Sequence, residues 1–358
     1  MRIIQAGLGA WGASWLKIIE QSQGWELAGV VDVNPAAAAA AGEQYAIPSY
    51  SSIGQALQAR DGVDAVLVIV PPEHHAPVAI SALEAGLHTL IEKPLAQNLE
   101  DGIRIVSAAE RFGKQAMVSQ NYRFKRAART VQRLILEGVI GDVEQVFIDY
   151  KKNPPFEGFR LEMDEPLIVD AMIHHLDQLR GIVGLEPSTV RARSWNTSSS
   201  RFKGNASSAV QYDCANGARV VYTGSWSALG RQSSWDGDWE IQGTKGAISW
   251  RNNEVQINFA SLFDTVFLAG AVERSGVMHV ELDALPVEER LGTLAAFQTA
   301  IATGQSSETD VTDNIRSLQL VTATAESARS DGAPVALLDT AELLRTSGTT
   351  DPYEGASR

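Results

Sequence analysis

The chain has 358 residues, of which 44% are hydrophobic and 20% are charged, a composition typical of a soluble globular protein. This length is too great for one ordinary core and predicts two domains. The formal net charge of −13 disfavours nucleic acid and anionic membranes as partners, because like charges repel.

The sequence shows no pattern of export or membrane insertion. Its single cysteine, Cys214, excludes an intrachain disulfide and is typical of a reducing compartment. No signal-peptide pattern precedes the first apolar run, and no apolar stretch reaches the roughly 20 residues that span a bilayer. These features predict a cytoplasmic protein.

Residues 1–120 alternate short apolar runs with helical patterns. We expect strands at 3–6, 27–32, 65–70, 89–92 and 115–119, and helices at 12–21, 35–45, 53–60, 77–84 and 99–112. Such alternation predicts a parallel sheet with helices on both faces. The first domain is therefore expected to be an α/β domain of the Rossmann type.

From residue 121 to residue 345 we expect an α+β domain with a large, mostly antiparallel open sheet. Strands are predicted at 143–150, 207–214, 218–226, 246–250, 254–259 and 277–282, with helices near 168–183, 288–303 and 313–330. No helices remain to cover the second face of this sheet, which predicts a homodimer or homotetramer formed through that face. Residues 346–358 are expected to form a loose tail.

A glycine-rich turn follows the first predicted strand. Residues 7–12 read G-x-G-x-x-G, between a strand and an amphipathic helix. Glycine here permits a tight turn, close approach to a pyrophosphate and packing of helix on strand, and the helix N-terminus offers free N–H groups to phosphates. The candidate cofactor-binding residues of this turn are Gly7, Gly9, Ala10, Trp11 and Gly12.

Asp32 ends the second predicted strand and points to the identity of the dinucleotide. A carboxylate at this place accepts hydrogen bonds from a ribose 2′-OH and repels a 2′-phosphate. No Arg or Lys follows in residues 33–35. Asp32 could instead cap the next helix, but Asn34 already fills that position. The expected cofactor is therefore NAD rather than NADP.

Three further motifs carry a family resemblance. They are Val-Pro-Pro-Glu-His-His at 70–75, Glu-Lys-Pro at 92–94 and Asp-Ala-Met-Ile-His-His at 170–175. With the glycine turn, and in this order, they resemble the Gfo/Idh/MocA oxidoreductases over nearly the whole chain. The resemblance implies that the helix at 313–330 returns toward the nucleotide domain.

The resemblance also implies roles for individual residues. Lys93 matches the family's active-site lysine beside the nicotinamide, and Asp170 and His174 match its catalytic Asp and His. The remaining implied cofactor contacts are Val70, Pro71, Pro72, His75, Glu92 and Asn121. Met172 stands where a small residue is usual, so it could narrow the substrate pocket.

The residue types suit alcohol oxidation. Lys93 can supply a positive charge that steadies a developing alkoxide. Helical spacing would place Asp170, His174 and Asp177 on one face, where the carboxylates could orient the imidazole, so His174 is the candidate general base. For His175, packing and substrate contact are both open. No metal is expected, although Asp and His at this spacing can bind one.

Other side chains are candidates for substrate contact. Tyr122 and Arg123 follow the last strand of the nucleotide domain, at the expected domain junction, where ligands usually bind. Lys152 and Arg160 could recognise an acidic or hydroxylated substrate, or could be solvated charges. Three tryptophans could stack on a sugar ring or belong to the core, namely Trp226, Trp235 and Trp239.

The resulting hypothesis is an NAD-dependent oxidoreductase acting on a secondary hydroxyl of a sugar, inositol or related polyol. One alternative is an NAD-dependent glycosidase that works by transient oxidation, elimination and re-reduction. Another is a non-catalytic NAD- or sugar-sensing regulator, which the presence of Lys93, Asp170 and His174 disfavours.

Overall fold

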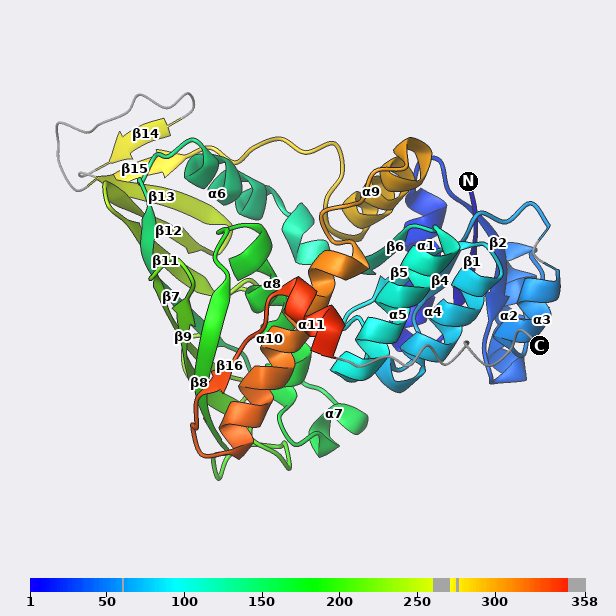
Figure 1. Ribbon diagram of the computed structural model, residues 1–358, viewed down its shortest axis with the longest axis horizontal. Coiled ribbons are helices and arrows are strands. Elements are labelled where there is room, and N and C mark those ends of the chain that lie inside the picture. Colours follow the sequence, from blue (N-terminus) through cyan, green and yellow to red (C-terminus); the bar gives the residue numbers. More distant parts are fainter. Residues whose placement is uncertain (60, 260–270, 275–276, 347–358) are drawn as a thin grey trace.

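The structure is a computed structural model that describes residues 1–59, 61–259, 271–274 and 277–346 (Figure 1). It consists of a nucleotide domain and a sheet domain, with helices between the two sheets. The loose tail that the sequence predicts lies, apart from Thr346, outside the described residues. Within the described part of the chain, no helix combines the length and the apolar character needed to cross a membrane.

The nucleotide domain contains a six-stranded sheet in the order β3-β2-β1-β4-β5-β6, in which every pair is parallel. The order reverses between β1 and β4, and ligands of such sheets bind at that crevice. The short β3 was not predicted, and the other strands agree with the expected positions to within two residues. The strands are β1 (Arg2–Ala6), β2 (Glu26–Val31), β3 (Ser49–Tyr50), β4 (Ala65–Val68), β5 (His88–Glu92) and β6 (Ala116–Ser119).

Helices lie on both faces of this sheet, as the sequence predicts. The Asn34 side chain accepts the backbone N–H groups of Ala36 and Ala37, and Pro35 is the first helical residue of α2, so local chemistry starts this helix. The helices are α1 (Ala10–Gln21), α2 (Pro35–Tyr45), α3 (Ile53–Gln58), the short 3₁₀ turn η1 (Pro72–His74), α4 (His75–Glu84) and α5 (Leu99–Phe112).

The second domain is built on a ten-stranded sheet in the order β14-β15-β13-β12-β11-β7-β10-β9-β8-β16. All neighbours are antiparallel except β7 and β10, which pair in parallel, so the sheet is mixed. The strands are β7 (Val143–Lys151), β8 (Pro187–Trp195), β9 (Ser207–Cys214), β10 (Arg219–Ser225), β11 (Asp238–Gly243), β12 (Gly246–Arg251), β13 (Glu254–Phe259), β14 (Ala271–Arg274), β15 (Val277–Val280) and β16 (Val335–Ala336).

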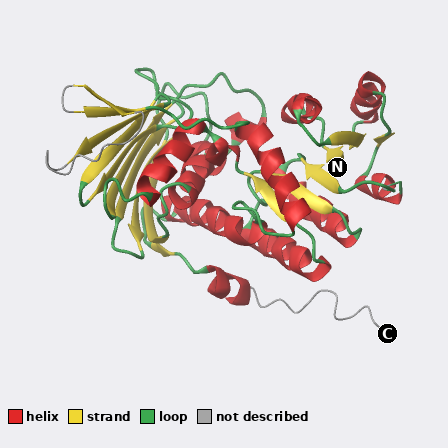
Figure 2. Cartoon of the chain, turned by 90° about the horizontal axis from the view of Figure 1, so that it is seen from above, coloured by secondary structure: helices red, strands yellow, loops and turns green. Residues whose placement is uncertain are grey.

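Helices cover one face of this sheet and leave the other bare, as the view from above shows (Figure 2). Apolar side chains of α6, α8 and α10 share one core with alternate residues of the strands. The remaining elements are η2 (Asn121–Phe124), α6 (Arg126–Leu136), α7 (Phe159–Glu162), the π-helical turn η3 (Leu167–Met172), α8 (Ile173–Gly181), α9 (Glu289–Thr303), α10 (Val311–Arg329) and α11 (Thr340–Thr346).

The bare face carries apolar and charged side chains together. Phe147 is 41% exposed and Val221 is 37% exposed. They line a shallow hollow with charged groups of both signs, among them Arg231 and Glu240. Association of two copies through this face stays a prediction.

Helix α10 joins the two domains. Ile315 and Leu318 belong to the core of the nucleotide domain, whereas Leu320 and Val321 belong to the core of the sheet domain. A Cβ on Gly102 in α5 would lie 2.6 Å from Ile315 Cδ1, so glycine allows α5 and α10 to approach closely. Residues near the end of the chain thus complete the core of the first domain, although they lie far beyond the expected domain boundary at residue 120.

Candidate active site

The glycine turn lies between β1 and α1 and is held by its neighbours. Gly7 has φ +105°, and a Cβ there would lie 2.3 Å from the Ile69 carbonyl oxygen. A Cβ on Gly12 would lie 2.3 Å from the Gly7 carbonyl oxygen. The buried Gln5 amide donates to the carbonyls of both glycines, at 2.9 and 2.8 Å. Gly7 and Gly12 are therefore required by the fold itself.

Gly9 differs from these two because nothing lies within 4 Å of a Cβ built on it. Its φ of −57° is open to any residue, so neither packing nor backbone conformation explains a glycine. The open space beside the N-terminus of α1 is the space that a pyrophosphate would fill, with free N–H groups of the first turn facing it. The turn therefore fits a dinucleotide.

Asp32 lies one residue beyond β2 and contacts the turn. Its Oδ2 accepts the Leu8 N–H at 2.7 Å, and its Oδ1 accepts the Asn34 N–H at 2.8 Å. The side chain is half-buried. Each oxygen has a further lone pair, so the carboxylate can accept ribose hydroxyls while it holds the turn.

Glu92, at the end of β5, is a buried carboxylate below the turn. Its Oε1 accepts the indole N–H groups of Trp11 at 2.9 Å and Trp15 at 2.8 Å, and its Oε2 accepts the Lys93 N–H at 3.0 Å. Burial raises the pKa of Glu92, although these donors oppose the rise. Glu92 thus orients Trp11, which is 51% exposed beside the turn.

Arg290 of α9 reaches the same turn from the other half of the chain. Its guanidinium carbon lies 4.6 Å from the centre of the Trp11 ring, and its Nη1 donates to Ser14 Oγ at 2.7 Å. Sequence reasoning missed Arg290, because it lies in an ordinary amphipathic helix far from any motif.

His75 joins two segments of the chain. One is Val70–Pro72, and the other contains the Lys93–Pro94 peptide bond, which is cis. The ring of His75 is 1% exposed, with Nε2 2.9 Å from the Val70 carbonyl oxygen and Nδ1 2.8 Å from the Pro94 carbonyl oxygen. His75 therefore contacts backbone on both sides and supports the Val70–Pro72 segment from behind, with Pro71 exposed in front. Its burial leaves it no direct contact with a ligand, in place of the expected cofactor contact.

Lys93 and Asp170 form the centre of the site. The Lys93 ammonium donates to Asp170 Oδ1 at 2.7 Å and to the Asp170 carbonyl at 3.0 Å, which leaves one N–H for another acceptor. Arg160 Nε donates to Asp170 Oδ2 at 2.5 Å. Burial alone would raise the pKa of Asp170, but Lys93 and Arg160 hold it well below its usual value. The carboxylate therefore stays ionised.

His174 lies one turn further along the same helical segment, half-buried. Its ring stacks on Tyr122 with the centroids 4.1 Å apart, and its buried Nδ1 has no hydrogen-bond partner among the described residues. Burial, with the charge of Lys93, holds the pKa of His174 well below its usual value. The ring is therefore neutral at pH 7 and able to accept a proton.

Among the described residues, neither Asp170 nor Asp177 hydrogen-bonds to His174, so the expected support by two carboxylates is reduced to the nearby charge of Asp170. Residues 167–172 form a π-helical turn, so the ideal α-helical spacing does not hold between Asp170 and His174. Asp177 is 1% exposed and points to the domain junction, where it binds Arg123 instead. Tyr122 is the neighbour that orients His174.

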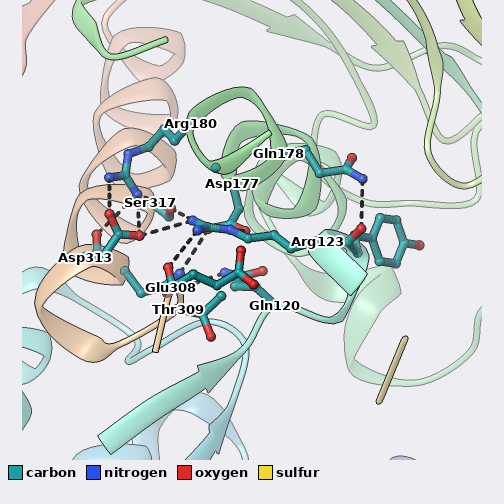
Figure 3. A network of polar contacts seen from close by, with 12 residues as sticks. Gln120, Arg123, Asp177, Gln178, Arg180, Glu308, Thr309, Asp313 and Ser317 are labelled. Carbon is teal, nitrogen blue, oxygen red and sulfur yellow. Dashed lines mark hydrogen bonds and ion pairs between the residues drawn. The ribbon is translucent and has the colours of Figure 1, made fainter. Parts of the chain in front are cut away.

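Arg123 belongs to a buried polar network (Figure 3). Its Nε and Nη2 donate to the two Asp177 oxygens at 2.6 and 2.7 Å, and its Nη1 donates to the Glu308 carbonyl at 2.7 Å. Its Nη2 also reaches Asp313, which in turn pairs with Arg180. Every guanidinium nitrogen is therefore used by the protein, which corrects the expected substrate contact of Arg123 to a structural role.

His175 also has a structural role in this arrangement. Its Nδ1 lies 3.0 Å from the Tyr222 hydroxyl and its Nε2 lies 2.9 Å from the Trp235 carbonyl oxygen, with the residue 1% exposed. Of the two possibilities that the sequence left open, the geometry favours packing. Met172 is fully buried in the core, against the Tyr212 hydroxyl, so it does not narrow a pocket.

Further side chains surround the His174 side of the site. Lys125 lies with its ammonium 3.6 Å from the centre of the Tyr122 ring and donates to both oxygens of Asp236, each at 3.0 Å. Asn121 begins η2, half-buried, directly after β6 and Gln120. Lys125 lies close after Tyr122 in the sequence, so its place beside the site could have been predicted. Asp236 belongs to no recognisable motif, so its place could not.

The three candidate tryptophans differ in how far each is exposed to solvent. Trp226 and Trp239 are buried at 2% and 0%, whereas Trp235 is 43% exposed. Lys152 lies over the Trp235 ring at 5.2 Å. Only Trp235 of the three is therefore available to a ligand. Among the described residues, no group of three or more His, Cys, Asp or Glu side chains is arranged to hold a metal ion.

Comparison with known proteins decides the family. The model of an oxidoreductase family with an NAD-binding Rossmann fold matches residues 1–120, and the model of a Gfo/Idh/MocA C-terminal domain matches residues 128–249. The chain belongs to the Gfo/Idh/MocA oxidoreductases. Residues 1–120 of this Gfo/Idh/MocA chain match the family's NAD-binding Rossmann domain.

Relatives of this Gfo/Idh/MocA chain include a 1,5-anhydro-D-fructose reductase of Ensifer adhaerens, 32% identical over 69% of this chain and 72% of the relative. An inositol 2-dehydrogenase of Corynebacterium glutamicum is 31% identical, but the match spans 56% of this chain and 59% of that enzyme. A solved oxidoreductase of Agrobacterium radiobacter, in complex with NAD+, L-tartaric acid and magnesium, has the same fold, with TM-score 0.82 and 21% identity over 94% of this chain and 98% of that one.

Proposed function

We propose that the chain catalyses NAD-dependent oxidation of a secondary hydroxyl in a sugar, inositol or related polyol, and the reverse reduction. The observation that carries this proposal is the Lys93–Asp170 ion pair beside a neutral, half-buried His174. The names of the relatives, which act on a polyol or a sugar derivative, agree with it.

NAD would be held by the turn at residues 7–12 and by Asp32, and would supply a hydride acceptor for the substrate carbon. Lys93 donates its remaining N–H to the substrate oxygen and stabilises the negative charge that develops there. Asp170 holds the Lys93 ammonium by two contacts and so fixes its direction. His174 takes the hydroxyl proton, because its ring is neutral and Tyr122 fixes its plane.

Asp32 supports a preference for NAD over NADP. Its carboxylate lies at the end of β2 and is already oriented by the Leu8 N–H. A 2′-phosphate placed beside it would meet like charge, whereas ribose hydroxyls would find an acceptor.

Replacement of Lys93 by Met tests the catalytic assignment. We expect loss of turnover by a factor of about 10² or more with NADH binding retained, because the charge acts on the reacting oxygen rather than on the cofactor phosphates. NADH binding is followed by its fluorescence, and the exposed Lys17→Met serves as control. Activity retained by Lys93→Met would contradict the role.

The glycosidase alternative differs in its products. Net oxidation accumulates NADH with a free polyol, whereas transient oxidation cleaves a glycoside without net NADH. Parallel measurement of NADH and of released aglycone over a panel of polyols and glycosides separates the two reactions. A regulator would produce neither.

A further inference from the structure

Four cations lie around the reacting centre, and the buried Glu92 carboxylate lies beside one of them, Lys93. Lys93 and Arg160 share the single carboxylate of Asp170, while Lys125 takes both oxygens of Asp236. Glu289 is more distant, 4.0 Å from Lys125 and 56% exposed on its side chain. The chain as a whole has a net charge of −13, so this gathering of cations is local.

Lys152 differs from the other three cations because it has no ion pair within the described residues. It follows β7 and lies with its ammonium 5.2 Å from the centre of the exposed Trp235 ring. Burial lowers the pKa of Lys152, and only Asp236 opposes this. An ammonium that is partly removed from water without a partner is costly, and an arriving anion would offset that cost.

Arg160 lies across an aromatic patch from Lys152. Its guanidinium carbon is 4.9 Å from the ring centre of Phe156, and the Phe156 and Trp235 rings are 6.5 Å apart. Only its Nε binds Asp170, and neither Nη has an acceptor in the described part of the chain. The edge of the guanidinium that carries the two Nη groups therefore has donors to spare, and their geometry matches that of a carboxylate.

We propose that the substrate is a polyhydroxy acid whose carboxylate binds between Lys152 and Arg160, while one of its CH–OH groups lies at Lys93 and His174. This inference rests on the proposed function and narrows its substrate class. In the reaction the C–H hydride passes to NAD, the O–H proton passes to His174 and then to solvent, and a C=O bond forms. The carboxylate is unchanged and serves for recognition.

Binding and turnover are measured separately, so that the two proposals can fail independently. Binding is measured by calorimetry on the NADH-loaded protein with matched pairs: glucose with glucuronate, galactose with galacturonate, and glucitol with gluconate. Glucose 6-phosphate provides a phosphate in place of the carboxylate. We expect at least one acid to bind about 10-fold or more tightly than its neutral partner, as a charge-assisted contact predicts.

The variants Lys152→Met and Lys152→Arg locate the anion. Lys152→Met is expected to weaken binding of the acid by about 10- to 100-fold relative to the neutral partner, and Lys152→Arg to retain most of it. Lys151→Met is the matched control, because Lys151 is exposed and pairs with Asp149.

Three results would overturn the inference: equal binding of acids and neutral partners, tighter binding of the sugar phosphate than of every acid, or equal loss for both partners in Lys152→Met. NADH formation from neutral sugars alone would leave the proposed function standing while the inference falls. Tight, Lys152-dependent binding of an acid without NADH formation would support the anion site and contradict the proposed oxidation.

Discussion

Removal of Arg123 is expected to destabilise the protein strongly. Arg123 and Asp177 are 4% and 1% exposed on their side chains, and two hydrogen bonds of 2.6 and 2.7 Å join them. In Arg123→Met the buried Asp177 carboxylate keeps, within the described residues, only Asn314 Nδ2 and Ser317 Oγ as donors. An uncompensated buried charge of this kind costs about 3–5 kcal/mol in the free energy of unfolding.

Urea unfolding followed by tryptophan fluorescence measures this loss. Trp15 reports on the nucleotide domain and Trp239 on the sheet domain, so separate transitions of the two domains would be visible. A double-mutant cycle with Asp177→Leu should return part of the loss, because the second change removes the charge that the first leaves unpaired. We expect a coupling energy of about 2 kcal/mol.

The exposed Arg193–Asp331 pair provides the control. Its side chains are 66% and 86% exposed, although the ion pair measures 2.8 Å. Arg193→Met should cost less than about 1 kcal/mol, because water screens the pair. A cost for Arg123→Met no greater than that of the control would refute the reasoning that burial gives this ion pair its importance.

Three further predictions concern pH, cofactor and assembly. Burial lowers the pKa of His175 to about 4, so between about pH 6.5 and pH 4 the unfolded chain binds a proton that the folded chain does not, and stability falls as the pH falls. His175→Asn should reduce that slope by about 1.4 kcal/mol per pH unit in urea unfolding. Asp32→Ala should lower the ratio of NAD to NADP activity at least about 10-fold. Phe147→Glu should lower the mass found by sedimentation velocity, because it places a charge on the bare face.

Each of these three predictions would be contradicted by a specific result. An unchanged slope in His175→Asn would mean that another group takes up the proton. An unchanged cofactor ratio in Asp32→Ala would remove the basis for NAD preference. A wild-type chain that sediments only as a monomer at micromolar concentration would contradict association through the sheet.

Much of the fold could be predicted because local signals agreed with it. The expected strand at 254–259 agrees with β13 at both ends, and alternation was clear there. The missed β8 begins with Pro187 and carries two arginines on its exposed positions. The missed β11 had a signal, since its buried Trp239 and Ile241 alternate with polar residues. The missed α6 had a signal, since Ala127, Val131 and Leu134 recur at helical spacing.

The site could be predicted only where motifs carry it. Lys93, Asp170 and His174 were named from the sequence, and the structure brings Lys93 and Asp170 into contact. The partner of Asp177 could not be foreseen, because a π-helical turn precedes it and Arg123 approaches from another element. Ideal helical spacing fails at such a turn, and pairing between distant segments leaves no local pattern.

The passage of α10 into the nucleotide domain has a consequence for how the protein is made. Val311, Ile315 and Leu318 complete the core of the nucleotide domain beside α5, yet they leave the ribosome nearly two hundred residues after β6 (311 − 119 = 192). The nascent first domain therefore presents the groove beside Gly102 to water until synthesis is almost finished. Its maturation depends on the last part of the chain, so a ribosome that stalls after the first domain would release a product with an open core.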